Sequence, residues 1–302
     1  MKLNLKSNLF ILHLTVLVWG FTGILGALIS INETHLVWYR VLIAAVSLFV
    51  YFKWTKTAIK VSKQTFFRLF FTGAIVGLHW ILFFGAIKAA TISVAMVCIS
   101  SLTLFTAILE PLLSKTRISK LEIVAGAFII FGIYVIFKFE TEYTTGIIMG
   151  LASALCASLF SIINAKQAKN RPAPIISFYE LTGAFFWISI YLFATDGFNN
   201  KAMYLNPSDL IYLLILGTIC TSVAYVAGVS VMKELSAFRV ALITNLEPIY
   251  AIILALIIFG KDEKMTSGFY FGALIILSTI FLFPIIKTKI EHKKLKKMPP
   301  II

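Results

Sequence analysis

One carboxylic acid of this chain lies inside a long apolar run, next to a proline. Glu247 and Pro248 interrupt the run from Ala237 to Phe259. At about 1.5 Å per residue this run can cross the roughly 30 Å apolar core of a bilayer, with Glu247 near the middle. A carboxylate costs at least ~2.5 kcal/mol there, so we expect it to face a protein interior or a wet cavity. Because Pro248 has no N–H, the carbonyl of Thr244 loses its helical partner, and the helix should weaken or kink beside the acid.

Two roles suit an acid in this position. Transporters often build their binding sites from a broken helix with a polar group at the membrane centre. Glu247 would then bind the amine of a substrate or exchange a proton. Alternatively, it is protonated and hydrogen-bonded and only joins two helices.

Other polar and aromatic side chains fall within neighbouring apolar runs. An imidazole can donate a hydrogen bond and aromatic faces attract cations, so His79 and Trp80 could grip an amino acid, although His79 could equally be a packing residue. Arg40 and Glu180 lie near the ends of their runs and are expected to snorkel or pair with neighbours. The predicted substrate site comprises Trp19, His79, Trp80, Ser100, Thr103, Asn164, Tyr225, Asn245 and Glu247, with Glu247 as the candidate for proton coupling.

The composition indicates an integral membrane protein. Hydrophobic residues make up 60% of the 302 residues and charged residues only 13%, which a soluble domain of this size could not cover with polar surface. The net charge of +14 comes from lysines and arginines between the apolar runs and near the C-terminus, so it indicates topology and lipid contact rather than nucleic acid. The sequence contains no metal-ligand or nucleotide-loop motif, so we expect no cofactor and no metal.

The apolar runs predict an all-α fold of ten transmembrane helices. Their connections are short, which leaves no room for a soluble catalytic domain. The predicted helices are Leu9 to Ile31, Leu36 to Phe52, Phe66 to Ile87, Ile92 to Leu113, Leu121 to Phe137, Gly146 to Ala165, Ile175 to Ala194, Leu210 to Met232, Ala237 to Phe259 and Ser267 to Ile286.

The distribution of charge and a weak internal repeat set the expected topology. Most of the 27 basic residues fall at the chain ends and after the second, fourth, sixth and eighth runs, which predicts a multi-pass protein of the cell (inner) membrane with both termini in the cytoplasm. Trp38-Tyr39-Arg40 resembles Phe178-Tyr179-Glu180. Residues 1–140 and 141–287 are therefore predicted to be two five-helix units around a central cavity, followed by a basic tail, 288–302. Because five is odd, the second unit must be inverted.

This layout resembles the drug/metabolite transporter superfamily, specifically its EamA-like family. The resemblance rests on Trp19-Gly20, on Tyr39-Arg40, and on Pro248 about a dozen residues before the charged turn 260–263, and it covers nearly the whole chain, from Leu9 to Ile286. It implies export or exchange of small metabolites or drugs through a cavity lined mainly by the first, third, fourth, sixth, eighth and ninth helices. The chain departs from the family pattern in lacking a glutamate after its fourth helix, where Thr116-Arg117 stand.

We therefore expect a secondary transporter, not an enzyme, that exports small metabolites, amino acids in particular, by alternating access. Its partners would be the substrate, the lipid bilayer and, as an open question, a coupling proton. A multidrug or quaternary-amine exporter is the alternative within the superfamily. A membrane enzyme acting on lipid-linked substrates is disfavoured because its catalytic residues would need larger loops, and a sugar-phosphate carrier because the membrane centre lacks Lys and Arg.

Overall fold

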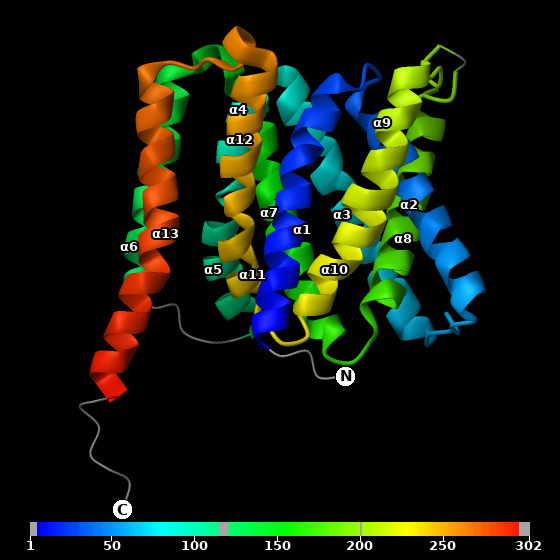
Figure 1. Ribbon diagram of the computed structural model, residues 1–302, viewed down its shortest axis with the longest axis horizontal. Coiled ribbons are helices and arrows are strands. Elements are labelled where there is room, and N and C mark those ends of the chain that lie inside the picture. The colour runs from blue at the N-terminus through cyan, green and yellow to red at the C-terminus, as the bar shows by residue number, and fades with distance from the viewer. Residues whose placement is uncertain (1–4, 115–119, 200, 296–302) are drawn as a thin grey trace, which may run out of the picture.

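The computed structural model describes residues 5–114, 120–199 and 201–295, and these residues form helices and no strands. Figure 1 shows them as a bundle of roughly parallel rods, in which the first helix begins and the last helix ends at the same end of the bundle. The N-terminal part contains α1 (Leu5–Leu28), α2 (Glu33–Thr55), α3 (Lys63–Ala89), α4 (Ile92–Ile99), α5 (Leu102–Ser114) and α6 (Lys120–Phe139). After the short turn η1 (Thr141–Tyr143) come α7 (Thr144–Ala168), α8 (Ala173–Ala194), α9 (Pro207–Gly217), the π-helical η2 (Thr218–Val223), α10 (Ala224–Val231), α11 (Ala237–Thr244), α12 (Leu246–Phe259), η3 (Gly260–Glu263) and α13 (Ser267–Leu295).

Eight segments of the described residues are long and apolar enough to cross a membrane, which identifies a multi-pass membrane protein. Three of them join more than one α-helix: α4 with α5, α9 with α10 through η2, and α11 with α12. The predicted fifth and tenth spans coincide with α6 and α13, whose apolar parts are shorter, Val124–Phe139 and Ser267–Phe283. Of the predicted basic tail, residues 288–295 belong to α13, and 296–302 lie outside the described residues.

Helix α3 occupies the centre of the bundle, where it packs along both α7 and α8. Close approach to α8 depends on glycine, because a Cβ on Gly73 would lie 2.3 Å from the carbonyl oxygen of Glu180. Where a glycine stands at the contact, two helix backbones can approach each other closely, as is common in membrane bundles. Helices α6 and α13 pack against each other at one edge (Figure 1).

Two long helices are broken after the same number of residues. Helix α11 has eight residues and ends at Thr244, and Asn245 separates it from α12, so the break predicted beside Glu247 is present. Helix α4 also has eight residues, and Ser100 and Ser101 separate it from α5. No proline stands at this second break. Instead, the hydroxyls of both serines bond backwards to the carbonyls of Met96 and Cys98, which competes with the regular helical ladder.

Candidate functional site

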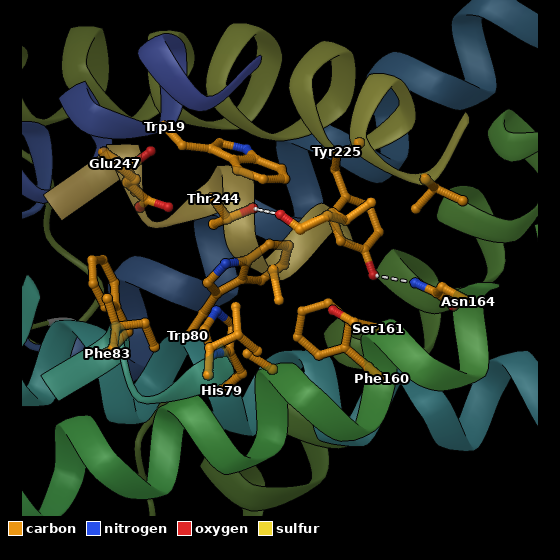
Figure 2. A pocket seen from close by; sticks show the side chains of 18 of the residues that line it. Trp19, His79, Trp80, Phe83, Phe160, Ser161, Asn164, Tyr225, Thr244 and Glu247 are labelled. Atoms are coloured by element: carbon orange, nitrogen blue, oxygen red, sulfur yellow. Dashed lines mark hydrogen bonds between the residues drawn. The ribbon is translucent and has the colours of Figure 1, made fainter. Parts of the chain in front are cut away.

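The main cavity lies between the two broken helices and the central helix α3. Its volume of about 90 Å³ accommodates several water molecules or a small solute. Figure 2 shows aromatic rings on several sides and Glu247 at one end. The cavity is lined by Trp19 and Thr22 of α1, Arg40 of α2, His79, Trp80 and Phe83 of α3, Ile99 of α4, Leu102 of α5, Ala157, Phe160, Ser161 and Asn164 of α7, Tyr225, Gly228 and Val229 of α10, Met232 just after α10, Val240, Ala241 and Thr244 of α11, and Glu247 of α12.

Glu247 reaches the cavity because the helix breaks just before it. It lies in the first turn of α12, where the free N–H groups of a helix favour a negative charge. Its side chain is half-buried, and within the described part of the chain its carboxyl group makes no hydrogen bond or ion pair. A carboxylate without a partner at the wall of a cavity is available to a ligand.

Arg40 is the second charged group at this cavity. Only 1% of its surface is exposed, so of the two expected alternatives Arg40 pairs with neighbouring side chains and does not snorkel to the membrane surface. Its Nε donates to the hydroxyl of Thr221 at 2.6 Å, and its guanidinium carbon lies 4.3 Å from the centroid of the Trp80 ring. Its Nη1 is buried and has no hydrogen-bond partner among the described residues, so this guanidinium retains donors that a ligand can satisfy.

Opposite charges therefore face the same cavity from α2 and α12. Arg40 and Glu247 act on each other electrostatically, although no direct ion pair joins them in the described residues. Two separated opposite charges in a low-dielectric cavity are best satisfied by a ligand that itself carries both signs.

His79 is held in place by α7. Its Nδ1 lies 3.0 Å from the carbonyl oxygen and 2.8 Å from the hydroxyl of Ser153. The same hydroxyl donates to the carbonyl of His79 at 2.9 Å, so Nδ1 is best assigned as the protonated nitrogen, donating to the Ser153 carbonyl. No other described residue bonds to Nε2, which is then a free acceptor on a side chain that lines the cavity.

Tyr225 and Asn164 line the cavity and also bond to a buried acid behind it. The Tyr225 hydroxyl donates to Oε2 of Glu180 at 2.8 Å, and the Asn164 amide donates to the same oxygen at 3.1 Å. Asn164 also donates to the Tyr225 hydroxyl at 3.1 Å (Figure 2). Glu180 is completely buried, so its predicted pairing is present and snorkelling is excluded.

The structure brings together six of the nine predicted site residues, namely Trp19, His79, Trp80, Asn164, Tyr225 and Glu247. Ser100, Thr103 and Asn245 are buried but do not line the cavity. Asn245 donates to the hydroxyl of Thr103 and, at 3.0 Å, to the carbonyl of Ala241. These bonds fasten the break between α11 and α12 to α5.

The sequence reasoning missed Arg40 and Thr221 as neighbours at the site. Thr221 lies in the π-helical turn η2, where its hydroxyl also bonds to the carbonyl five residues earlier, that of Leu216. Such turns often occur at functional sites. The sequence gives little indication of a π-helical turn, since such a turn is defined by its hydrogen-bond spacing and not by a residue type. Within the described residues, no three His, Cys, Asp or Glu side chains gather as metal ligands.

Membrane-length helices around a small cavity that is lined by two charged side chains are typical of a membrane transporter. The profile of the EamA-like transporter family matches this chain twice, over residues 6–138 and 144–284. The chain belongs to this family, and it is a membrane transporter of the drug/metabolite type.

Individual relatives agree with this assignment. An uncharacterized transporter of Archaeoglobus fulgidus is 24% identical over 291 residues, which cover 93% of this chain and 98% of that protein. An uncharacterized transporter of Synechocystis sp. is 26% identical over 186 residues, covering 57% of this chain and 52% of the relative. A protein of known crystal structure has the same fold, with a TM-score of 0.68 at 14% identity over 93% of this chain and 98% of that one.

Proposed function

We propose that this protein is a secondary transporter that exports small metabolites, amino acids in particular, by alternating access. The observation that carries the proposal is the presence of Arg40 and Glu247 at one cavity without a direct ion pair between them. The carboxylate of an amino acid would bind the free donors of Arg40, and its ammonium group would bind Glu247.

The aromatic lining supports this substrate class. The faces of Trp19 and Trp80 attract cations, and the cavity also offers apolar surface for a side chain. Gly228 gives Trp19 its room, since a Cβ there would lie 2.8 Å from the indole ring. A ligand with a single charge would leave either the arginine or the carboxylate desolvated and unpaired, which is costly in a buried site.

We further propose that ten membrane segments form two inverted repeats, residues 1–140 and 141–287. Three observations support this: the family profile matches twice, α4 and α11 both break after eight residues, and each accepts a carboxylate at its N-terminus. Glu263 accepts bonds from the backbone of Ile92 and Ser93, and Glu110 accepts one from Phe238. Such symmetry allows one site to open to either side.

The cavity extends toward the end of the bundle where α1 begins and α13 ends, which we assign to the cytoplasm. Met232 and Val240, on either side of the short connection between α10 and α11 at that end, line it (Figure 1). Hydrogen bonds tie the opposite end together: Asp209 accepts from the backbone and hydroxyl of Ser30 at 2.8 and 2.5 Å, and Lys88 donates to the carbonyls that follow α1. An inward-facing conformation is consistent with this arrangement.

Counterflow in proteoliposomes tests the proposal. A thermal-shift screen of the amino acids first identifies one that stabilises the purified protein, and L-alanine serves as the minimal probe. We expect unlabelled L-alanine to exchange with the labelled form, whereas ethylamine and propionate, which each lack one of its two charged groups, compete poorly. If propionate competed as well as alanine, Glu247 would not recognise the ammonium group, and the proposal would fail.

A quaternary-amine exporter is the second candidate, because the aromatic rings and Glu247 together resemble a cation site. Arg40 argues against it, since its charge repels a cation that brings no carboxylate. Strong competition by ethylamine and by tetramethylammonium, with no effect of alanine, would favour this alternative.

A further inference from the structure

Behind the cavity, the buried acid Glu180 and its neighbour Asn164 each have an oxygen that accepts no hydrogen bond within the described residues. Oε1 of Glu180 is buried and has no hydrogen-bond partner in the described parts of the chain, and the same is true of Oδ1 of Asn164. The other oxygen of Glu180, Oε2, accepts from both Tyr225 and Asn164. An ionised carboxylate with one bare oxygen in a dry interior is costly, and a neutral carboxyl group is far less so. What this cluster lacks is a proton.

Among the described residues, the surroundings of Glu180 supply no cation to balance a negative charge. Helix α10 presents Tyr225 and α7 presents Asn164, both neutral. Helix α3 presents the backbone of Gly73, while its basic residue Arg68 is exposed. On α2, Arg40 is bonded to Thr221 and stacked on Trp80, and Lys166 of α7 is exposed and donates to the carbonyl of Leu113.

We propose that Glu180, rather than Glu247, carries the coupling proton of this transporter. This inference rests on the proposed function and divides the work between two acids: Glu247 faces the cavity and binds the substrate amine, whereas Glu180 lies one side chain further back. In the conformation seen here the proton is on Oε1. When it leaves, the O–H bond breaks, the proton passes to water in the open cavity, and the carboxylate keeps the donors of Tyr225 and Asn164.

Tyr225 links the two acids' environments. Its ring lines the cavity and makes an edge contact with Trp80, with centroids 5.7 Å apart, while its hydroxyl bonds to Glu180. Trp80 in turn lies against Arg40. A substrate carboxylate arriving at Arg40 would press on Trp80 and move Tyr225, which changes the hydrogen bonding of Glu180 and therefore the ease with which it holds a proton.

Infrared spectroscopy tests the proton itself, without any substrate. The full-length protein is compared between neutral and strongly alkaline solution, where a buried protonated carboxyl group gives a distinct carbonyl band. We expect Glu180→Gln to lose one component of this band, and the exposed control Glu142→Gln to keep it. An unchanged band in Glu180→Gln would show that Glu180 is ionised and would overturn the proposal.

A second variant decides the matter if Glu180→Gln does not fold. Tyr225→Phe keeps the carboxyl group but removes one of the two donors on Oε2, so the band should persist and shift in frequency. A band with no shift would mean that the carboxyl group observed is not Glu180, which also overturns the proposal.

Transport then separates coupling from binding. With labelled L-alanine, Glu180→Gln should retain counterflow within about twofold of the parent, while accumulation driven by a pH gradient falls about tenfold or more. Loss of counterflow with intact gradient dependence, or accumulation driven by sodium instead of pH, would contradict the assignment. If the parent protein itself does not exchange alanine, the proposed substrate is wrong, and the infrared result still decides the role of Glu180.

Discussion

The guanidinium group of Arg40 lies over the ring of Trp80, 4.3 Å from its centroid, inside the membrane-spanning bundle. Phe84 lies on the same guanidinium at 5.4 Å. A desolvated cation over an aromatic face gains ~2 kcal/mol or more, which offsets part of the cost of burying the charge without a carboxylate. Stacking on an aromatic face uses no N–H donor, so the N–H groups of Arg40 that are not bonded to Thr221 remain available to an anion.

Replacing Arg40 by lysine should therefore weaken carboxylate recognition although the charge is kept. Lysine cannot reproduce the planar fork or its stacking on Trp80. Loss of a charge-assisted bond of ~1.5–3 kcal/mol corresponds to an affinity for L-alanine about 10- to 150-fold lower, with the weak competition by ethylamine unchanged. Isothermal titration of purified protein measures both, with the exposed Arg68→Lys as the matched control. Equal losses for alanine and ethylamine would show that Arg40 acts on the fold rather than on the carboxylate.

Glu247→Gln should remove recognition of the amine and leave the protein folded. The amide keeps the shape of the side chain but not its charge, and Glu247 has no partner in the described chain whose loss would unfold the bundle. Alanine affinity should fall about 10- to 150-fold, while propionate, which has no ammonium group, should compete as well as in the parent. Binding and transport are measured across a range of pH, with Glu142→Gln as the control. A variant that transports like the parent at every pH would refute any role for this acid.

The sequence predicted those parts of the site whose causes are local. Glu247 and Pro248 are adjacent, so the acid and the helix break could be inferred together from a missing N–H. The depth of His79 and Trp80 followed from counting along an apolar run. The break at Ser100 was not predicted, because serine hydroxyls bond backwards in unbroken helices too, as Ser47 does in α2.

Features that depend on distant partners could not be predicted. The burial of Arg40 requires Thr221, which is 181 residues away and turned toward it by a π-helical register. The same holds for Glu180, whose position near a helix end left snorkelling and pairing both open, whereas the structure buries it where α3 approaches closely at Gly73. Residue type and depth along a helix therefore could not identify the partners of Arg40 and Glu180, because those partners depend on how the helices pack on each other.

Gly73→Ala tests that packing directly. A Cβ at Gly73 would lie 2.3 Å from the carbonyl oxygen of Glu180 and 2.7 Å from the nitrogen of Ala184, both of them backbone atoms that cannot rotate away. Overpacking of this kind costs about 1–3 kcal/mol, so the melting temperature in detergent should drop. Leu78→Ala on the same helix, which is 49% exposed toward the surroundings, should have little effect. Similar losses in both variants would mean that the α3–α8 contact is not tightly packed.

Replacing Glu263 should destabilise the protein more than replacing its hydrogen-bond partner Ser93. The Glu263 carboxylate is 5% exposed and accepts three bonds at the start of α4, from the backbone of Ile92 at 2.9 Å and from the backbone and hydroxyl of Ser93 at 2.9 and 2.7 Å. Glu263→Ala leaves two buried N–H groups without an acceptor, at ~1–3 kcal/mol each. Ser93→Ala removes only the hydroxyl bond, so its cost should be near ~1 kcal/mol. Denaturation in mixed detergent compares the two, and equal losses would show that the carboxylate serves only the serine hydroxyl and not the helix N-terminus.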